Sequence, residues 1–270
     1  MNGSGDGDGS PPQVIDFLAA SEHRIETLRV LVEQGTVTRR DVRSEVDASR
    51  STVRRTLEGF LERGWVESTT DGYRITPAGE LMVDVFGQFV ERVERVETYT
   101  PLLRWLPPSA LDVDLAWLEG GTLTVATEAD PYAPAQTQTE TVRTAERFRG
   151  FLPAIERDGT ELVHDRITAG ELTASIVVSP AVSETVRSDP FEELLREQLA
   201  TGRLDVFVSP DPLPYYLGLP DEDGVEIGGM DDDGIPRALL QSTNDDLRRW
   251  GEETFESARA DAERLTEGDL

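Results

Sequence analysis

Hydrophobic positions in the first quarter of the chain recur at helical spacing. Between Ser21, a candidate cap, and Gly35, a candidate stop, the inner positions of a helix fall at Ile25, Leu28, Leu31 and Val32. After Ser49, a second cap, they fall at Val53, Leu57, Phe60 and Leu61. A stripe of this period is typical of a helix with one face on a core. The pattern predicts two amphipathic helices.

A shorter helix is predicted between these two. Thr38 can cap it, with Asp41 three residues later as the reciprocal acid of a capping box. Val37 and Val42 occupy the two positions of a hydrophobic staple. Because Ser49 opens the next helix soon afterwards, the sequence predicts a helix-turn-helix.

A β-hairpin is predicted directly after the second of these helices. Gly64 ends the helix, residues 65–68 and 73–76 read as strands, and Asp71-Gly72 is a strong hairpin-turn signal. Thr76-Pro77 then caps a further helix.

Positive charge gathers on the predicted helix-turn-helix. Residues 39–55 hold six arginines and three acidic residues, a local charge of +3 in a chain whose formal charge is -27. Arginine clusters of this kind neutralise the phosphates of duplex DNA. The N-terminal part of a recognition helix reaches base edges in the major groove. The candidate DNA contacts, Arg54 and Arg55 first among them, are Thr38, Arg39, Arg40, Arg50, Ser51, Thr52, Arg54, Arg55 and Arg74.

Two runs in this region carry a family resemblance. ASRSTVRRTLEGFLERGWVE, followed by DGYRITPAGE, resembles the winged helix-turn-helix of archaeal and bacterial transcription regulators over roughly residues 21–97. The resemblance implies double-stranded DNA as a partner, with base and phosphate contacts from the second helix and a minor-groove or phosphate contact from Arg74. A solvated arginine-rich face, or a winged helix that binds another protein as an adaptor, is the alternative.

The helix predicted after Pro77 carries a seam of heptad type. Its apolar positions recur at intervals of four and three residues, flanked by glutamates and arginines. A DNA reader gains from dimerisation, because two copies related by a dyad read a palindrome. Packing on the protein's own second domain would explain the seam equally well. The candidate homodimer contacts are Met82, Phe86, Phe89, Val93 and Val96.

Strand and helix patterns alternate in the remainder, which predicts a parallel crossover and an α/β layer. Strands are expected at 122–127, 172–178 and 204–208, and a hairpin is expected within 224–241. Helices are expected at 141–151, from Pro190 with Asp189 as its cap, and at 245–265. The predicted fold class is therefore α+β and α/β: an N-terminal winged helix-turn-helix followed by a mixed α/β effector domain. The expected domains are a disordered tail at 1–14, a DNA-binding domain with its linker helix at 15–98 and an effector-sensing domain at 99–270.

The α/β part offers one candidate pocket. Two of its strands end in Ser-Pro, and open α/β sheets bind ligands beyond the carboxyl ends of their strands. Strand-stopping prolines and core tyrosines are the simpler explanation of the same residues. The candidate effector-pocket residues are Ser179, Ser209, Asp211, Tyr215 and Tyr216.

A second resemblance covers about residues 105–265. The runs LATGRLDVFVSPDPLPYYLGL and DDDGIPRALLQSTND resemble the C-terminal effector domain of the methanogenesis-regulator type, which follows winged helices in many haloarchaeal proteins. It implies sensing of some signal, such as a small-molecule effector, and carries over no ligand residues.

The composition is typical of an acidic protein adapted to high salt. The chain has 53 acidic residues, 26 arginines and no lysine, with a pI near 4.3, which is typical of a salt-in halophile. In molar salt the Debye length is about 3 Å, so self-repulsion and phosphate attraction are both screened. Residues 99–270 hold 14 arginines and 35 acidic residues, a net charge of -21, so the second domain is not expected to face DNA.

Enzymatic functions are disfavoured. Without cysteine or lysine the chain has no thiolate, no Cys-ligated metal, no P-loop lysine and no Schiff base. His23 is expected on the surface, and His164, expected in a strand, is the one histidine that could serve a hydrolase, for which no G-x-S-x-G elbow is present. We therefore expect a regulator rather than an enzyme, with no cofactor and no metal. No apolar run reaches the ~18 residues of a membrane span and no signal segment opens the chain, so a cytoplasmic protein is expected.

Overall fold

The structure, a computed structural model, describes residues 10–108 and 112–270. The chain folds into two units that divide between Glu94 and Arg95, within helix α5 (Pro77–Leu103). Residues 1–9 of the expected disordered tail lie outside the described residues. The expectation is wrong for residues 11–14, which begin helix α1 (Pro11–Ala19). This segment is ordered because apolar side chains of α1 pack on the N-terminal core.

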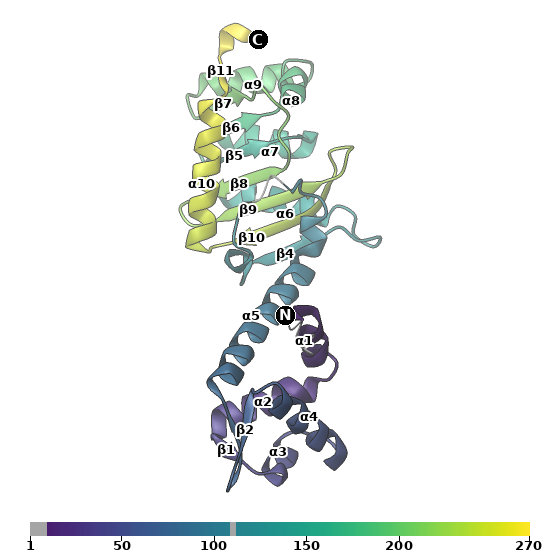
Figure 1. The fold of residues 1–270 in the computed structure, drawn as a ribbon. Helices are drawn as coiled ribbons and strands as arrows, with labels where there is room; N and C mark the ends of the chain where they lie inside the picture. Colours follow the sequence, from purple (N-terminus) through teal and green to yellow (C-terminus); the bar gives the residue numbers. More distant parts are fainter. Residues whose placement is uncertain (1–9, 109–111) are drawn as a thin grey trace, which may run out of the picture. The chain divides into compact units, whose positions relative to one another are not determined.

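The N-terminal unit has the predicted order of helices followed by a hairpin (Figure 1). Its core gathers the apolar stripes of α2 and α4 with Val37, Val42 and Trp65. Val32 is an exception to the expected inner face, because 45% of its surface is exposed. The three-stranded sheet has the order β1-β3-β2 and is antiparallel throughout. The elements after α1 are α2 (Glu22–Gln34), β1 (Thr36–Val37), α3 (Arg39–Glu45), α4 (Arg50–Glu62), β2 (Val66–Thr69) and β3 (Gly72–Ile75).

Gly72 is the residue that lets the hairpin lie against β1. Its φ of 147° is one that side-chain-bearing residues rarely adopt. A Cβ at this position would stand 2.3 Å from the carbonyl oxygen of Val37. The predicted hairpin is confirmed, but its two turn residues are Thr70 and Asp71, one position earlier than expected, and Gly72 is the first residue of β3.

Helix α5 is longer than the sequence predicts. The linker helix, expected within residues 15–98, does not end at residue 98 but continues through Pro101 to Leu103. Burial accounts for this: Tyr99 and Leu102 pack in the core of the C-terminal unit, and the Tyr99 hydroxyl donates a hydrogen bond to the Leu118 carbonyl oxygen. This tertiary packing outweighs the backbone hydrogen bond that a proline removes from a helix.

The C-terminal unit is built on one eight-stranded mixed sheet with the order β11-β7-β6-β5-β8-β9-β10-β4. Strands β5, β6 and β7 run parallel, and the other pairings are antiparallel. The predicted crossover is confirmed between β6 and β7, whereas β4, the first predicted strand, pairs antiparallel with β10 at the edge of the sheet. The predicted 224–241 hairpin is confirmed as β9 and β10. The strands are β4 (Thr122–Val125), β5 (Arg147–Leu152), β6 (Thr173–Val178), β7 (Leu204–Val208), β8 (Tyr216–Pro220), β9 (Val225–Met230), β10 (Pro236–Ser242) and β11 (Glu263–Leu265).

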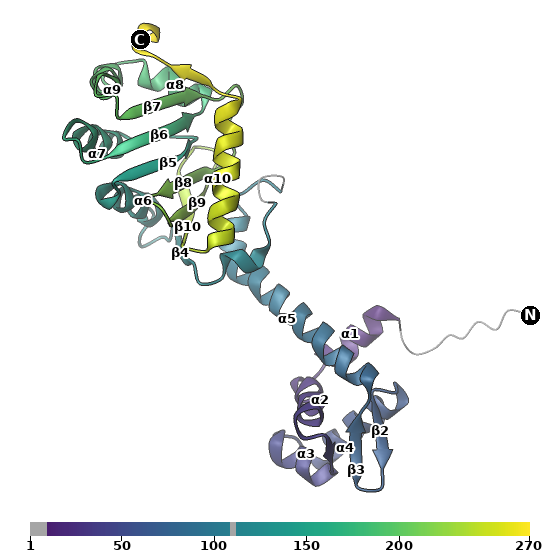
Figure 2. The ribbon, with the colours of Figure 1, turned by 90° about the vertical axis from the view of Figure 1, so that its left-hand side faces the viewer.

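Helices cover both faces of this sheet. Figure 2 shows α6, α7 and α9 on one face and α10 on the other. Two cores result: one lies under α10 and includes Phe255 and Leu247, and the other lies under α7 and α9 and includes Ile167 and Leu195. The helices are η1 (Leu115–Leu118), α6 (Ala133–Thr144), α7 (Arg157–Thr168), α8 (Pro180–Val186), α9 (Phe191–Ala200), α10 (Asp245–Ala260) and η2 (Glu267–Asp269).

Four local predictions are wrong in this unit. The segment 141–151 divides into the end of α6 and strand β5, because its last residues pair with β6 and β8. His164 lies in helix α7, where the apolar positions follow a helical period, and not in a strand. Helix α9 begins at Phe191, and Pro190 is its N-cap residue. The last helix ends at Ala260, since residues 263–265 pair with β7.

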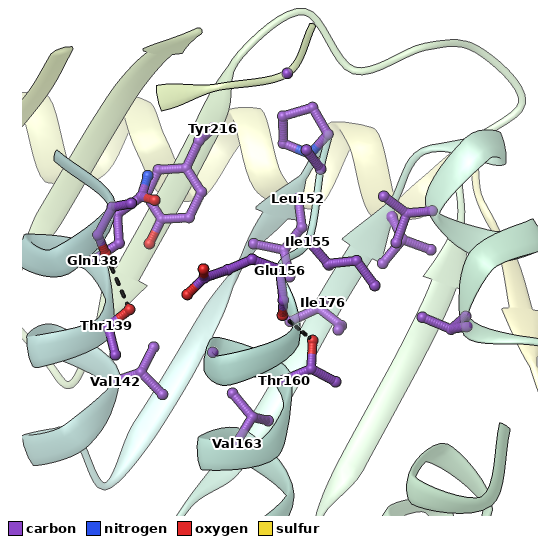
Figure 3. A pocket seen from close by; sticks show the side chains of 18 of the residues that line it. Gln138, Thr139, Val142, Leu152, Ile155, Glu156, Thr160, Val163, Ile176 and Tyr216 are labelled. Atoms are coloured by element: carbon purple, nitrogen blue, oxygen red, sulfur yellow. Dashed lines mark hydrogen bonds between the residues drawn. The ribbon is translucent and has the colours of Figure 1, made fainter. Parts of the chain in front are cut away.

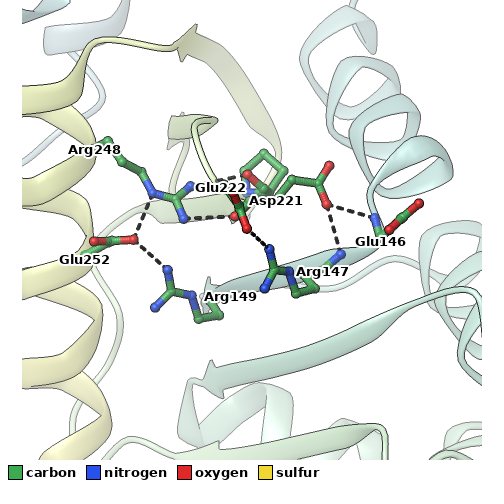
Figure 4. A network of polar contacts seen from close by, with 8 residues as sticks. Glu146, Arg147, Arg149, Asp221, Glu222, Arg248 and Glu252 are labelled. Atoms are coloured by element: carbon green, nitrogen blue, oxygen red, sulfur yellow. Dashed lines mark hydrogen bonds and ion pairs between the residues drawn. The ribbon is translucent and has the colours of Figure 1, made fainter.

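A buried arginine joins α10 to the turn between β8 and β9 (Figure 4). The Arg248 guanidinium donates to the carbonyl oxygens of Pro220 and Asp221, at 3.2 and 3.1 Å, and to that of Gly224. The guanidinium also donates to the Glu252 carboxylate at 3.1 Å, and Glu252 accepts a second hydrogen bond from Arg149 of β5 at 2.6 Å. This network fixes the turn against the helix and the central strands.

Candidate nucleic-acid interface

The two short helices of the N-terminal unit are held by their predicted caps. Thr38 Oγ1 accepts from the Asp41 amide at 3.3 Å, and the Asp41 carboxylate accepts from the Thr38 amide at 2.8 Å. The hydrogen bonds that the Thr38 amide and hydroxyl donate to the Asp41 carboxylate hold the pKa of Asp41 below its usual value. Ser49 Oγ accepts from the Thr52 amide at 3.2 Å and opens α4. Both predicted caps are therefore confirmed.

The arginines of α3 and α4 converge on one hollow between the two helices. It has a volume of about 780 Å³. Its arginines come from the exposed side of α3 and from the first turns of α4, next to the positive end of the α4 dipole. The hollow is lined by Arg39, Arg40, Arg43, Ser44, Arg50, Val53 and Arg54.

Little negative charge offsets these arginines. Within the described part of the chain, no ion pair within 4.0 Å involves Arg39, Arg40, Arg43 or Arg50. Arg54 has only a loose contact of 3.9 Å with Glu58 of the same helix. All five side chains are exposed, so the hollow is a concentrated positive site on a strongly acidic chain.

Arg54 and Arg55, paired as the first candidates, point to different places. Arg54 lies in the hollow with Arg50, one turn earlier on α4. Arg55 does not line the hollow and instead lies near Arg24 of α2. Burial lowers the pKa of Arg24 most, and repulsion by the positive charges of Arg63 and then Arg55 lowers it further. The two arginines therefore belong to different parts of the surface.

The remaining predicted contacts surround the hollow. Arg39 donates to the Tyr73 hydroxyl at 2.7 Å, which ties α3 to the hairpin. Arg74 lies on β3 directly opposite Glu67 and donates to its carboxylate at 2.8 Å. A DNA contact from Arg74 would have to replace that ion pair. The hydroxyls of Ser51 and Thr52 both lie 2.9 Å from Ser49 Oγ, within the cap of α4.

Arg43 lines the hollow but was not among the candidate contacts predicted from the sequence. The sequence could have indicated Arg43, because it follows Arg39 by four residues and the two therefore share one face of a helix. The prediction included Arg39 and Arg40 of this helix and omitted only Arg43.

The candidate effector pocket does not form as predicted. Ser179 caps α8 and donates to the Pro153 carbonyl oxygen, and Ser209 bonds to the backbone of Asp211. Tyr215 packs between Phe151 and Trp250 on the α10 side of the sheet. Tyr216 faces the other side and lines a cavity there. Neighbouring strand residues point to opposite faces, so the two tyrosines cannot share one pocket wall.

The histidines have local partners. His164 Nε2 lies 3.3 Å from Glu197 Oε2, and its Nδ1 lies 3.4 Å from the Leu194 carbonyl oxygen. His23 pairs with Glu26 one turn away. In the described residues, no group of three or more His, Cys, Asp or Glu side chains is arranged to hold a metal ion. Nor does any helix in the described ranges have the length and apolarity needed to cross a bilayer.

Two protein-family models match the chain. The HVO_A0261 N-terminal domain matches residues 12–98, and the middle domain of the methanogenesis regulatory protein FilR1 matches residues 131–261. The chain is therefore built from two regulator-type domains, one in each half, and is a transcriptional regulator. The first match covers the arginine-lined hollow of the regulator, and the second covers most of its eight-stranded sheet. A search of curated proteins found no significant match.

Solved structures resemble the regulator only distantly. The archaeal chromatin protein TrmBL2, described as showing a novel mode of DNA binding, is 13% identical, with a TM-score of 0.42 over 95% of this chain and 100% of its own. Nuc from Salmonella typhimurium, a phospholipase D family member, is 10% identical, with a TM-score of 0.42 over 54% of this chain and 99% of its own. An IclR-family putative regulator from Rhodococcus is 12% identical, with a TM-score of 0.21 over 96% of both chains. Because these TM-scores are below 0.5, no function is inferred from them.

Proposed function

We propose that this regulator is a cytoplasmic transcription factor that binds duplex DNA through the α3–α4 face of a winged helix-turn-helix. The hollow lined by five arginines carries the proposal. Five clustered arginines repel one another, and among the described residues only Arg54 has an acidic partner, Glu58 at 3.9 Å, so the cluster adds no stability to the free protein. The phosphates of a DNA duplex would neutralise these charges. The N-terminus of α4 adds amide donors, which favour an anion at the same place.

Arg50 and Arg54 take the central role in this proposal. They lie one turn apart on the exposed side of α4, and Val53 between them is buried, which fixes the helix to its core. The α3 arginines, including Arg43, are placed to contact the flanking phosphates. Base contacts read the sequence, whereas phosphate contacts fix the register of the protein on the duplex and supply affinity that falls with salt.

The test is binding of duplexes from the region upstream of the regulator's own gene, measured across a potassium chloride series. We expect Arg50→Ala with Arg54→Ala to weaken binding by ~1–3 kcal/mol for each base that these arginines read. If Arg40→Ala with Arg43→Ala removes phosphate contacts, the slope of log affinity against log salt should shrink by ~0.9 for each phosphate.

The matched control is Arg143→Ala with Arg249→Ala. These arginines are exposed on α6 and α10, and their removal changes the net charge by the same amount as each test variant. A general electrostatic effect would weaken binding equally in all three variants. Equal binding by the Arg50/Arg54 variant and this control would contradict the proposed reading face.

We further propose a homodimer formed along α5. The predicted seam is divided in the structure: Met82 and Phe86 pack on the N-terminal core, and the other predicted positions are exposed. We expect the exposed side of α5 to contact a second copy of the chain, because two DNA-binding units related by a dyad bind the two half-sites of a palindrome. The exposed stripe proposed for the dimer is Leu81, Val85, Phe89, Val93 and Val96, with exposed fractions of 67, 60, 46, 43 and 43%.

Sedimentation in concentrated potassium chloride tests this interface. Phe89→Asp with Val93→Asp should convert the dimer to a monomer, because charges would be buried against an apolar stripe. Gln88→Asp with Thr98→Asp adds the same charge to exposed polar positions of α5 and should leave the dimer intact. A wild-type protein that sediments as a monomer would refute the dimer.

The proposed role of the C-terminal unit is to sense a signal. Support comes from the regulatory protein whose middle domain it matches, and from the cavity beside Tyr216. An adaptor that binds another protein through the N-terminal unit remains the alternative function. Its signature would be co-purification with a protein partner and no affinity for duplex DNA.

A further inference from the structure

A cavity of about 460 Å³ lies between the sheet of the C-terminal unit and the helices that cover one face (Figure 3). Helices α6 and α7 form two walls, represented by Val142 and Val163, and Ile176 of β6 forms part of the floor. The ring of Tyr216 closes one end. This volume lies within the range of small-molecule sites, ~300–1,000 Å³.

The wall chemistry excludes an anionic ligand. Glu156 and Asp233 are the charged residues among those that line the cavity, all of them in the described part of the chain, and both are exposed. A carboxylate or phosphate would meet these acids without an arginine or histidine in the wall. Most of the lining is aliphatic or aromatic, which favours an apolar molecule.

One polar group in the wall lacks a partner. Gln198 of α9 lines the cavity and is 4% exposed, and its side-chain amide nitrogen is buried without a hydrogen bond. Leaving a buried donor unsatisfied costs free energy that a ligand acceptor would recover. Rotation of the Gln198 side chain would bring this nitrogen, which has almost no accessible surface, to a carbonyl or ether oxygen of a ligand in the cavity.

We propose that this cavity binds a neutral, mainly apolar small molecule whose oxygen accepts a hydrogen bond from Gln198. The site is inferred from the cavity itself, and only its regulatory consequence rests on the proposed function. Tyr216 connects the site to the centre of the sheet, because its hydroxyl donates to the buried Glu226 carboxylate at 2.8 Å.

Prodan, a neutral naphthalene ketone, is a suitable probe, because its emission reports both an apolar environment and a hydrogen bond to its carbonyl. We expect the full-length protein to bind Prodan and to bind the anionic probe anilinonaphthalene sulfonate more weakly. Gln198→Leu should weaken Prodan binding roughly 2- to 12-fold, the effect of one hydrogen bond, and remove the hydrogen-bond shift of its emission. The same variant should not lower the melting temperature of the free protein, because it removes an unsatisfied donor.

Filling the cavity is the second test. Val142→Trp should abolish Prodan binding, whereas Val32→Trp, at an exposed position of the N-terminal unit, should leave it unchanged. Prodan binding that survives both Val142→Trp and Gln198→Leu would overturn the site, as would a clear loss of stability in Gln198→Leu. A protein that binds Prodan but no DNA would keep the site and refute the proposed function instead.

Discussion

Replacing Arg248 with methionine tests how the C-terminal unit is held together. The Arg248 side chain is 7% exposed and reaches three backbone carbonyl oxygens and Glu252. Burial raises the pKa of Glu252, but hydrogen bonds from Arg149 and Arg248 outweigh it and hold that pKa below its usual value. Methionine keeps much of the side chain's apolar volume and removes every one of these donors.

The magnitude follows from the burial and the number of partners. Hydrogen bonds to a charged group contribute ~1.5–3 kcal/mol each, but removing the guanidinium also relieves its desolvation cost. Water can reach part of the turn, because Asp221 is exposed, and Glu252 keeps Arg149 as a partner. We therefore expect a net loss of about 2–4 kcal/mol, because the carbonyl oxygens that water does not reach lose their donor at ~1–3 kcal/mol each.

The neighbouring residue supplies the control. Arg249 lies on the same helix with 64% of its side chain exposed and pairs only with Asp246 among the ion pairs of the described residues. Arg249→Met should change stability by less than about 0.5 kcal/mol. The assay is urea unfolding in potassium chloride, followed by tryptophan fluorescence. Equal midpoints for the two variants would show that the Arg248 network does not stabilise the unit.

Two further predictions concern single positions. Burial raises the pKa of Glu226 despite hydrogen bonds from Thr141, Tyr216 and Gln241, so the folded state binds a proton more tightly than the unfolded state. Its contribution is complete below the unfolded pKa near 4.5 and is lost as pH rises through the folded pKa. Glu226→Gln should therefore gain stability relative to wild type as pH rises through this range, measured by thermal melts, and a difference that stays constant with pH would refute this prediction. Gly72→Ala should lower the stability by about 1–3 kcal/mol. Gly87→Ala should raise it by roughly 0.5–1 kcal/mol, because Gly87 lies within a helix and no atom lies within 4 Å of the added Cβ. Unfolding midpoints of these two variants that move in the same direction would contradict this.

Local chemistry determined the N-terminal unit. Caps at Thr38 and Ser49, the apolar period of α4 and the hairpin turn before Gly72 are each decided by a few adjacent residues. For that reason the order of helix, turn, helix and hairpin could be derived from the sequence. The charge contrast that marked residues 39–55 is also a property of composition alone.

Only the tertiary structure decided which side chains meet. It placed Arg43 with Arg54 and separated Arg55 from both, because a helical face is fixed by what the opposite face buries. It carried α5 past Pro101, since Tyr99 and Leu102 gain a distant core. It also turned Tyr215 and Tyr216 to opposite sides of the sheet and left Gln198 facing a cavity. Such contacts join residues far apart in the chain, and their free energy depends on packing that no local pattern encodes.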